Sequence, residues 1–203
     1  MKKLSLAVAI LMAFAMTGSA ALVNTCDAGD DVLGGGYSCQ VANLTFSNFS
    51  AVRFPGPAGS VYIGSSGVLG SEAYLTFQPG LSAGQDMWFY YTVTGTHYGI
   101  DLEHGGSNTS ILERVCDGQG FNAANNCVGT QLALFPDNTG AKEILSYAGG
   151  PVNVAMIYKD ILVGNPGHMS SFTQSFTIPE PVTLSLIGFG LFALGLLRRR
   201  LKK

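Results

Sequence analysis

The two long apolar runs of this 203-residue chain lie at its two ends. Residues 4–16 form the first run and residues 182–197 form the second, and basic residues flank both of them. Runs of this kind direct a chain to or through a membrane and are not part of a globular core. The folded domain therefore has to come from the segment between them, which we place at residues 21–178.

The N-terminal end has the three parts of a secretory signal peptide. Lys2 and Lys3 precede the apolar run, and the small residues Gly-Ser-Ala-Ala follow it at positions 18–21. A signal peptidase cuts after small residues, so we expect residues 1–20 to be removed, with the cut after Ala20 or Ala21. An uncleaved N-terminal anchor is the alternative, although the run is short for a membrane span.

The C-terminal end, residues 179–203, also has three parts. The motif Pro179-Glu180-Pro181 precedes the second apolar run, and five basic residues follow it: Arg198, Arg199, Arg200, Lys202 and Lys203. The run is shorter than the ~20 residues of a typical transmembrane helix, but flanking basic side chains can reach back to the interface. Lys and Arg collect on the cytoplasmic side of membrane helices. The order thus predicts a transmembrane helix over residues 182–197, with the domain outside the inner membrane.

The tail PEPVTLSLIGFGLFALGLLRRRLKK resembles the PEP-CTERM sorting signal of Gram-negative bacteria. The resemblance implies that exosortase, a membrane protease-transpeptidase, recognises Pro179, Glu180 and Pro181, cuts near them, and releases or transfers the protein to the cell surface or extracellular polymer matrix. It also implies that the basic residues 198–203 stop transfer through the membrane. A plain C-terminal anchor after a proline-rich linker is the alternative.

Between the two ends the sequence has the pattern of an all-β protein. It contains many of the chain's 27 glycines, which favour turns, and no stretch has a sustained helical period. A short helical turn is expected near residues 27–33. Alternating, β-branched and aromatic segments predict about nine or ten short strands, and therefore an antiparallel β-sandwich of jelly-roll type. The expected strands are residues 39–52, 60–63, 73–77, 86–94, 98–103, 109–116, 127–135, 142–147, 152–163 and 170–178.

All four cysteines lie in this middle segment, and an even number in an exported domain favours disulfides. Three connectivities are possible, of which we favour the local pairs Cys26 with Cys39 and Cys116 with Cys127. Each would close a short loop and contribute about 3 kcal/mol in the chain-entropy model. Zinc is the competing interpretation, but the sequence has no Cys-x-x-Cys and no histidine at ligand spacing.

Two further segments resemble a group of uncharacterised PEP-CTERM proteins. They are CDAGDDVLGGGYSCQVANLTFSNFS, near the start of the domain, and DILVGNPGHMSSFTQSFTIPEP, in which a final strand runs into the sorting signal. The resemblance implies a secreted sandwich and says nothing of a ligand.

The strand at residues 86–94, DMWFYYTVT, is apolar on both faces. Trp88 and Tyr90 are two residues apart and so share a face. A flat aromatic pair could stack on sugar rings, which makes these residues candidate sugar-binding residues. The alternative is that they pack under a loop or in a second core.

Acidic residues and histidines offer weaker candidates for chemistry. Asp27, Asp30 and Asp31 form one loose acidic group, and Asp101 and Glu103 form another, but neither has the spacing of a known calcium loop. A hydrolase could use Asp101 and Glu103, with His97 or His104 close in sequence. None of the common catalytic motifs accompanies them.

These observations predict an exported surface or matrix protein that is structural or adhesive and has no catalytic activity, cofactor or metal. The net charge of -2 is small and the basic residues lie mainly at the extreme termini, so the middle segment shows no nucleic-acid-binding face and argues against DNA or RNA as a partner. The expected partners are the membrane, exosortase and an exopolysaccharide. The alternatives are a carbohydrate-binding module and, less favoured, a glycoside hydrolase.

Overall fold

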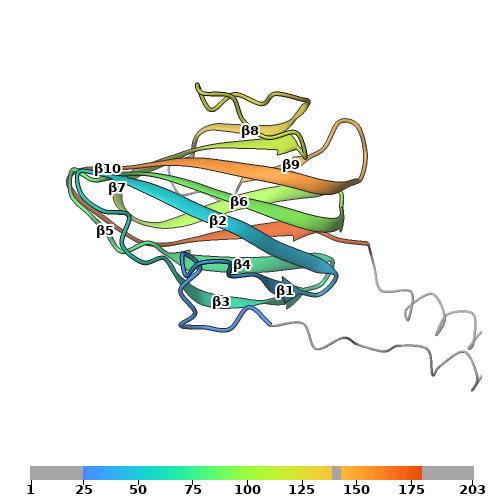
Figure 1. Cartoon of the computed structure of the whole chain (residues 1–203), viewed down its shortest axis with the longest axis horizontal. Helices are drawn as coiled ribbons and strands as arrows, with labels where there is room; N and C mark the ends of the chain where they lie inside the picture. Colours follow the sequence, from blue (N-terminus) through green and yellow to red (C-terminus); the bar gives the residue numbers. More distant parts are fainter. Residues whose placement is uncertain (1–24, 139–142, 180–203) are drawn as a thin grey trace, which may run out of the picture.

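The computed structural model describes residues 25–138 and 143–179, and all of its regular structure is β. Figure 1 shows the strands in two layers that face each other. There are ten strands in the described residues: β1 (Cys39–Val41), β2 (Leu44–Phe54), β3 (Tyr62–Leu69), β4 (Glu72–Gln78), β5 (Leu81–Ser82), β6 (Asp86–His97), β7 (Gly99–Asp117), β8 (Gln131–Asn138), β9 (Glu143–Ser146) and β10 (Val152–Thr177). Every pair among these strands is antiparallel, as the sequence predicts.

Two long strands, β7 and β10, pair with each other along most of their length and fold over together in the middle. The first half of β10 pairs with β6 and the second half pairs with β4. We define the first layer as β1, β2, β6, the first half of β10, the second half of β7, and β8. The second layer consists of β3, β4, the second half of β10, the first half of β7, and β9. Both layers therefore belong to one continuous sheet that folds over on itself in a sandwich-like fold.

The fold-over of β7 and β10 corrects the sequence-based strand boundaries. We expected separate strands at residues 98–103 and 109–116, and again at 152–163 and 170–178, because glycines interrupt both patterns. The structure instead continues each pair as one strand, with register shifts between Val163 and His168. Gly106 makes this possible: its φ is +147°, and a Cβ there would lie 2.3 Å from the carbonyl oxygen of His168. The glycines thus bend the strands without ending them.

The core lies between the layers and is built from the inward side of each strand. Phe89 of the first layer packs against Phe77 and Phe172 of the second, with ring centroids 5.2 and 5.9 Å apart. Phe46 and Phe176 make a similar contact at 5.7 Å. All five side chains are fully buried. Aromatic contacts of this kind thus hold the two layers together.

The two cysteine pairs are disulfides, Cys26–Cys39 and Cys116–Cys127, which agrees with the local pairing favoured above. The expected helical turn near residues 27–33 is wrong. The amides of Gly29 and Val32 donate to the carbonyls of Ile63 and Val61, so this segment bonds to the chain that leads into β3. These long-range bonds replace the local i to i−4 bonds that a helix needs.

Candidate functional site

The outer side of the first layer has a cluster of exposed apolar side chains around Trp88. Trp88, on β6, is half-buried and lies between Val52 of β2 and Asp160 of β10. The ring of Phe54 meets the Trp88 ring edge-on at 5.3 Å. Val52, Phe54 and Leu162 are 44%, 46% and 52% exposed. We call this surface the aromatic face, and define it by Val52, Phe54, Asp86, Trp88, Tyr90, Asp160 and Leu162.

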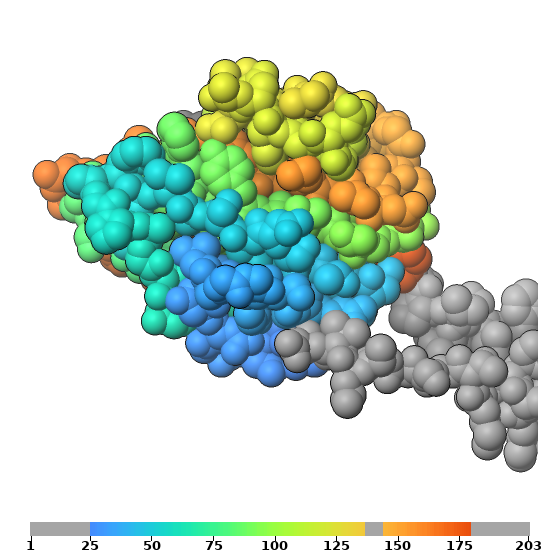
Figure 2. Space-filling model, in the orientation of Figure 1, coloured from blue at the N-terminus to red at the C-terminus, as the bar shows by residue number. Residues whose placement is uncertain are grey.

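Tyr90 lies on the same face but is covered by a loop. Its hydroxyl donates to Oδ1 of Asn125 at 2.9 Å, and its ring contacts Phe121 and Tyr158 at 6.0 and 5.0 Å. Both Asn125 and Phe121 belong to the segment between β7 and β8, which stands over β6 and β10 (yellow in Figure 2). The sequence-predicted pair is therefore divided: Trp88 belongs to the open part of the face, and Tyr90 packs under a loop.

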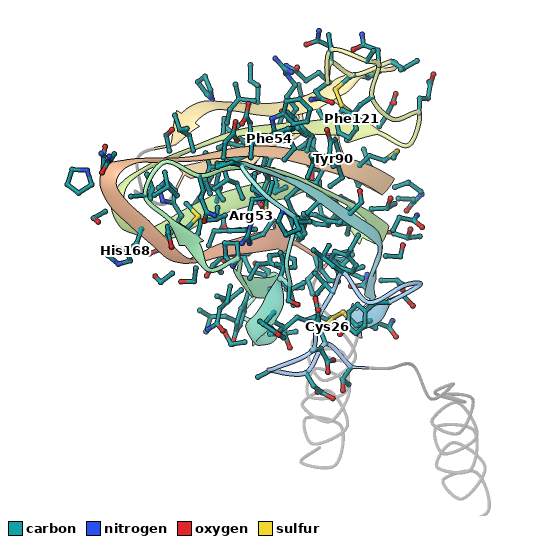
Figure 3. All side chains as sticks on the ribbon, turned by 60° about the vertical axis from the view of Figure 1, so that its left-hand side comes forward. Cys26, Arg53, Phe54, Tyr90, Phe121 and His168 are labelled. Carbon is teal, nitrogen blue, oxygen red and sulfur yellow. A yellow bond between two sulfur atoms is a disulfide. The ribbon has the colours of Figure 1, made fainter. Side chains whose placement is uncertain are left out.

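The covering loop is held in place at two points. The Cys116–Cys127 disulfide ties it to the end of β7. The Arg114 guanidinium, on β7, donates to the carbonyl oxygen of Asn125 at 2.8 Å. In Figure 3, Phe54, Tyr90 and Phe121 lie together at one side of the molecule, well away from Cys26 at the other end. The aromatic face is thus built by rigid strands and a cross-linked loop.

An open hollow of about 380 Å³ adjoins Tyr90 and the loop. It is lined by Asn48, Asn122 and Asn125, together with Ser50, Tyr90, Tyr91, Thr92, Phe121 and Met156. Asn48 lies in a bulge of β2 with φ at +55°, and its Nδ2 donates to Thr92 Oγ1 at 3.3 Å. Asparagine amides both donate and accept hydrogen bonds, so they suit a ligand with many hydroxyl groups.

Two carboxyl groups, Asp86 and Asp160, stand beside the Trp88 ring. Asp86 lies between Phe54 and Leu162 in neighbouring strands, and Asp160 is diagonal to it on β10. Burial against these apolar side chains, followed by repulsion from the Asp160 carboxylate, raises the pKa of Asp86 to about 6. The aromatic face therefore combines apolar rings with acidic hydrogen-bond acceptors.

The residues considered for hydrolysis are not gathered in one open site. Asp101 is buried, and its carboxylate accepts hydrogen bonds from the amide and hydroxyl of Ser175 at 3.1 and 2.6 Å. Glu103 is exposed, whereas His97 is buried and contacts the Gly95 carbonyl through Nδ1 at 2.7 Å. His104 is buried as well, and its Nδ1 lies 3.2 Å from the hydroxyl of Thr109.

The first acidic group serves local structure. Asp30 accepts a hydrogen bond from the Tyr37 hydroxyl at 2.7 Å, and Asp31 accepts from the amides of Leu33 and Val61. Across residues 25–138 and 143–179, no three His, Cys, Asp or Glu side chains are arranged to hold a metal ion.

The sorting motif falls largely outside the described residues. Pro179 is the last of them and is half-buried. Glu180, Pro181, the apolar run and the basic residues 198–203 lie beyond, as does the predicted signal peptide. In the part of the chain that the structure describes, no helix is long and apolar enough to cross a membrane.

Sequence reasoning missed several residues of this site: Phe54, Asp86, Phe121, Asn125 and Asp160. Phe54 follows Val52 at the two-residue spacing of a strand face, and this signal could have found it. Asp160 lies beside Trp88 because β10 pairs with β6 in a particular register. That register cannot be predicted from the sequence.

Comparison with known proteins does not assign the chain to a family. No protein-family model matches the chain, and no curated protein matches it. Among solved structures, chitosan-binding module 1 from a chitosanase/glucanase of Paenibacillus sp. IK-5 is 12% identical, with a TM-score of 0.27. The alignment covers 63% of this chain and 94% of the module. A likeness of this degree establishes neither a shared fold nor a shared ligand.

Proposed function

We propose that this chain is an exported surface or matrix protein that holds polysaccharide on its aromatic face and performs no catalysis. The observation that supports this most is the half-buried Trp88 ring, with exposed Phe54 and Val52 beside it and Asp86 and Asp160 next to it. The proposal joins the two functions suggested by the sequence, adhesion and carbohydrate binding.

The chemistry of a sugar matches that of the aromatic face. A pyranose ring has apolar C–H faces and a rim of hydroxyl groups, so it can stack on an aromatic ring while its rim makes hydrogen bonds. Trp88 and Phe54 offer the apolar surface, and the carboxylates of Asp86 and Asp160 offer acceptors. The asparagines around the hollow extend the polar contacts beyond Tyr90.

Two features support the proposed location. The Cys26–Cys39 and Cys116–Cys127 disulfides suit an oxidising compartment outside the cytoplasm. The tail resembles a PEP-CTERM signal, and processing by exosortase at Pro179-Glu180-Pro181 after tethering by residues 182–197 would deliver the domain to the surface or matrix. As part of the same proposal, the folded-over β7–β10 pair favours the jelly-roll class of sandwich.

The test is co-sedimentation of the protein with insoluble neutral, amino-sugar and acidic polysaccharides. Trp88→Ala should weaken binding about tenfold, which corresponds to ~1.4 kcal/mol, because it removes the stacking surface. Tyr74→Ala is the matched control, since Tyr74 is a half-buried aromatic residue on the outer side of β4 in the second layer. Equal binding by the wild type and Trp88→Ala, or no binding to any polymer of the panel, would exclude the proposal.

A further inference from the structure

Three polar side chains meet in the middle of the apolar core. They are Glu113 on β7, Lys159 on the first half of β10, and Gln174 on the second half of β10, and each is 0% exposed. Glu113 and Lys159 belong to the first layer and Gln174 to the second, so the group spans the interior of the sandwich. Lys159 is the only lysine within residues 25–138 and 143–179.

The contacts within this group are specific. Nζ of Lys159 donates to Oε2 of Glu113 and to Oε1 of Gln174. The Gln174 amide nitrogen donates to the carbonyl oxygen of Asp101, which fixes the orientation of the carboxamide. The carbonyl carbon of Gln174 is therefore one bond beyond the oxygen that the lysine amine already touches.

The surroundings exclude water. The Phe172 ring centroid is 5.2 Å from Nζ of Lys159, and Phe172 packs in turn on Phe77 and Phe89. Burial lowers the pKa of Lys159 and raises the pKa of Glu113, so transfer of the ammonium proton to the Glu113 carboxylate is easier in this core than in water. A neutral amine has the free electron pair that a nucleophile needs.

We propose that Lys159 and Gln174 become joined by an amide bond across the core, with Glu113 transferring the proton. The amine nitrogen of Lys159 attacks the side-chain carbonyl carbon of Gln174, and a C–N bond forms. Glu113 first takes the ammonium proton of Lys159, then gives it to the amide nitrogen of Gln174, and takes the second proton from the attacking nitrogen, so that it ends as the carboxylic acid. The original C–N bond then breaks and ammonia leaves. No oxidant or other reactant is consumed.

The bond would connect the two halves of the folded-over strand β10. These halves lie in opposite layers, so the bond would join the layers from the inside, where the disulfides do not reach: Cys26–Cys39 and Cys116–Cys127 each close a loop of sequence neighbours. A covalent link between the layers would suit a protein that bears load, but its presence does not depend on a sugar ligand.

Peptide mapping of the purified full chain tests the bond directly. The protein is denatured, reduced, alkylated and digested with trypsin, which cuts after free lysine but not after an acylated one. We expect the peptides on either side of Lys159 to remain one species, lighter by one ammonia, with fragment ions that place the link at Lys159 and Gln174. A wild-type digest with free Lys159 and an unchanged Gln174 would overturn the proposal.

Two variants test the role of Glu113. Glu113→Gln keeps the shape of the side chain but removes the proton acceptor, and it should abolish the linked species. Ser175→Ala is the matched control: it is adjacent to Gln174 but contacts the Asp101 carboxylate on the outer side, so the link should persist. If Glu113→Gln is still linked to the wild-type extent, Glu113 is not the proton carrier. Should Glu113→Gln fail to fold, the wild-type digest alone decides on the bond.

Discussion

The outer sides of the two layers come from strands with the same alternating pattern, yet their chemistry differs. On the second layer, the hydroxyl of Ser65 donates to that of Thr76 at 3.1 Å, and the hydroxyls of Thr76 and Thr173 lie 2.9 Å apart. We call this row the hydroxyl face. On the outer side of the first layer, the neighbouring strands β6 and β2 instead carry Trp88 and Phe54, whose rings are in contact. The hydroxyl groups of the hydroxyl face satisfy one another, and the exposed large apolar side chains of the second layer lie on its outer strands β3 and β9: Tyr62, Val68, Leu69 and Ile144. On the first layer, by contrast, exposed apolar side chains gather around the Trp88 ring.

A second difference is the loop cover. The segment between β7 and β8 shields Tyr90 on the aromatic face through Phe121 and Asn125, and a disulfide fixes its position. Exposed apolar surface lowers solubility and invites aggregation, so an exposed cluster around Trp88 needs a reason. We therefore expect the proposed polysaccharide to bind on the first layer, at the border between the open and the covered part of the aromatic face.

The largest expected effect comes from removing the disulfides separately. Replacing Cys116 and Cys127 with serine, or Cys26 and Cys39 with serine, should each lower the free energy of unfolding by about 3 kcal/mol. The two changes should differ in their effect on function. Loss of Cys116–Cys127 frees the loop over Tyr90 and should weaken polysaccharide binding, while loss of Cys26–Cys39 should not.

Urea unfolding combined with co-sedimentation checks this prediction. The binding assay is performed where both variants remain folded, as monitored by circular dichroism. Equal binding by the two variants would show that the loop plays no part in the aromatic face.

A smaller effect is expected from the two carboxyl groups beside Trp88. The pKa of Asp86 is about 6 in the folded protein against an ordinary value of 3.8, so the folded state holds this proton more tightly than the unfolded state. The free energy of unfolding should therefore fall as the pH rises from about 4 to about 6, and stay lower above that range. Asp160→Asn removes the repulsion and should recover about 1 kcal/mol at pH 7, a value reduced for solvent screening.

The measurement is urea unfolding of the wild type and Asp160→Asn at pH 4 and pH 7. At pH 4 the two proteins should be almost equal, because Asp86 is protonated. Glu103→Gln changes the net charge by the same amount in the second layer, where the residue is exposed, and is the control. A gain for Asp160→Asn that is the same at both pH values would contradict the assignment.

The smallest effect belongs to the hydroxyl face. Thr173→Val removes one member of the Thr76–Thr173 contact and should cost about 0.5 to 1 kcal/mol of unfolding free energy. It should leave polysaccharide binding unchanged. A clear loss of binding would place the ligand on the second layer, and the contrast between the two faces would disappear.

Much of the fold could be predicted from the sequence, because alternation reports which side of a strand is buried. In the expected strand at residues 170–178, Phe172 and Phe176 lie on one side and Thr173, Ser175 and Thr177 on the other, which predicts that the phenylalanines face the core, and both are fully buried. The continuity of β7 and β10 could not be predicted. Glycines at positions such as 106 usually end a strand, and only long-range pairing shows that here they bend it.

The site could be predicted only in part. Trp88 and Tyr90 were found because they are two large aromatic residues that share one face of a strand that is apolar on both faces. Their separation into an open and a covered residue depends on Phe121 and Asn125, which are distant in sequence. The core position of Lys159 was also missed, since an alternating pattern interrupted by one lysine does not reveal the Glu113 and Gln174 that meet it.

Trp88 is the chain's single tryptophan, so its fluorescence reports on the proposed site directly. The most direct measurement is a titration of the full chain with a soluble form of a polysaccharide from the co-sedimentation panel, followed by tryptophan emission. Stacking of a sugar ring on Trp88 should shift the emission saturably to shorter wavelength, and Tyr74→Ala should respond in the same way. Polysaccharide binding that leaves the emission of Trp88 unchanged would contradict the account.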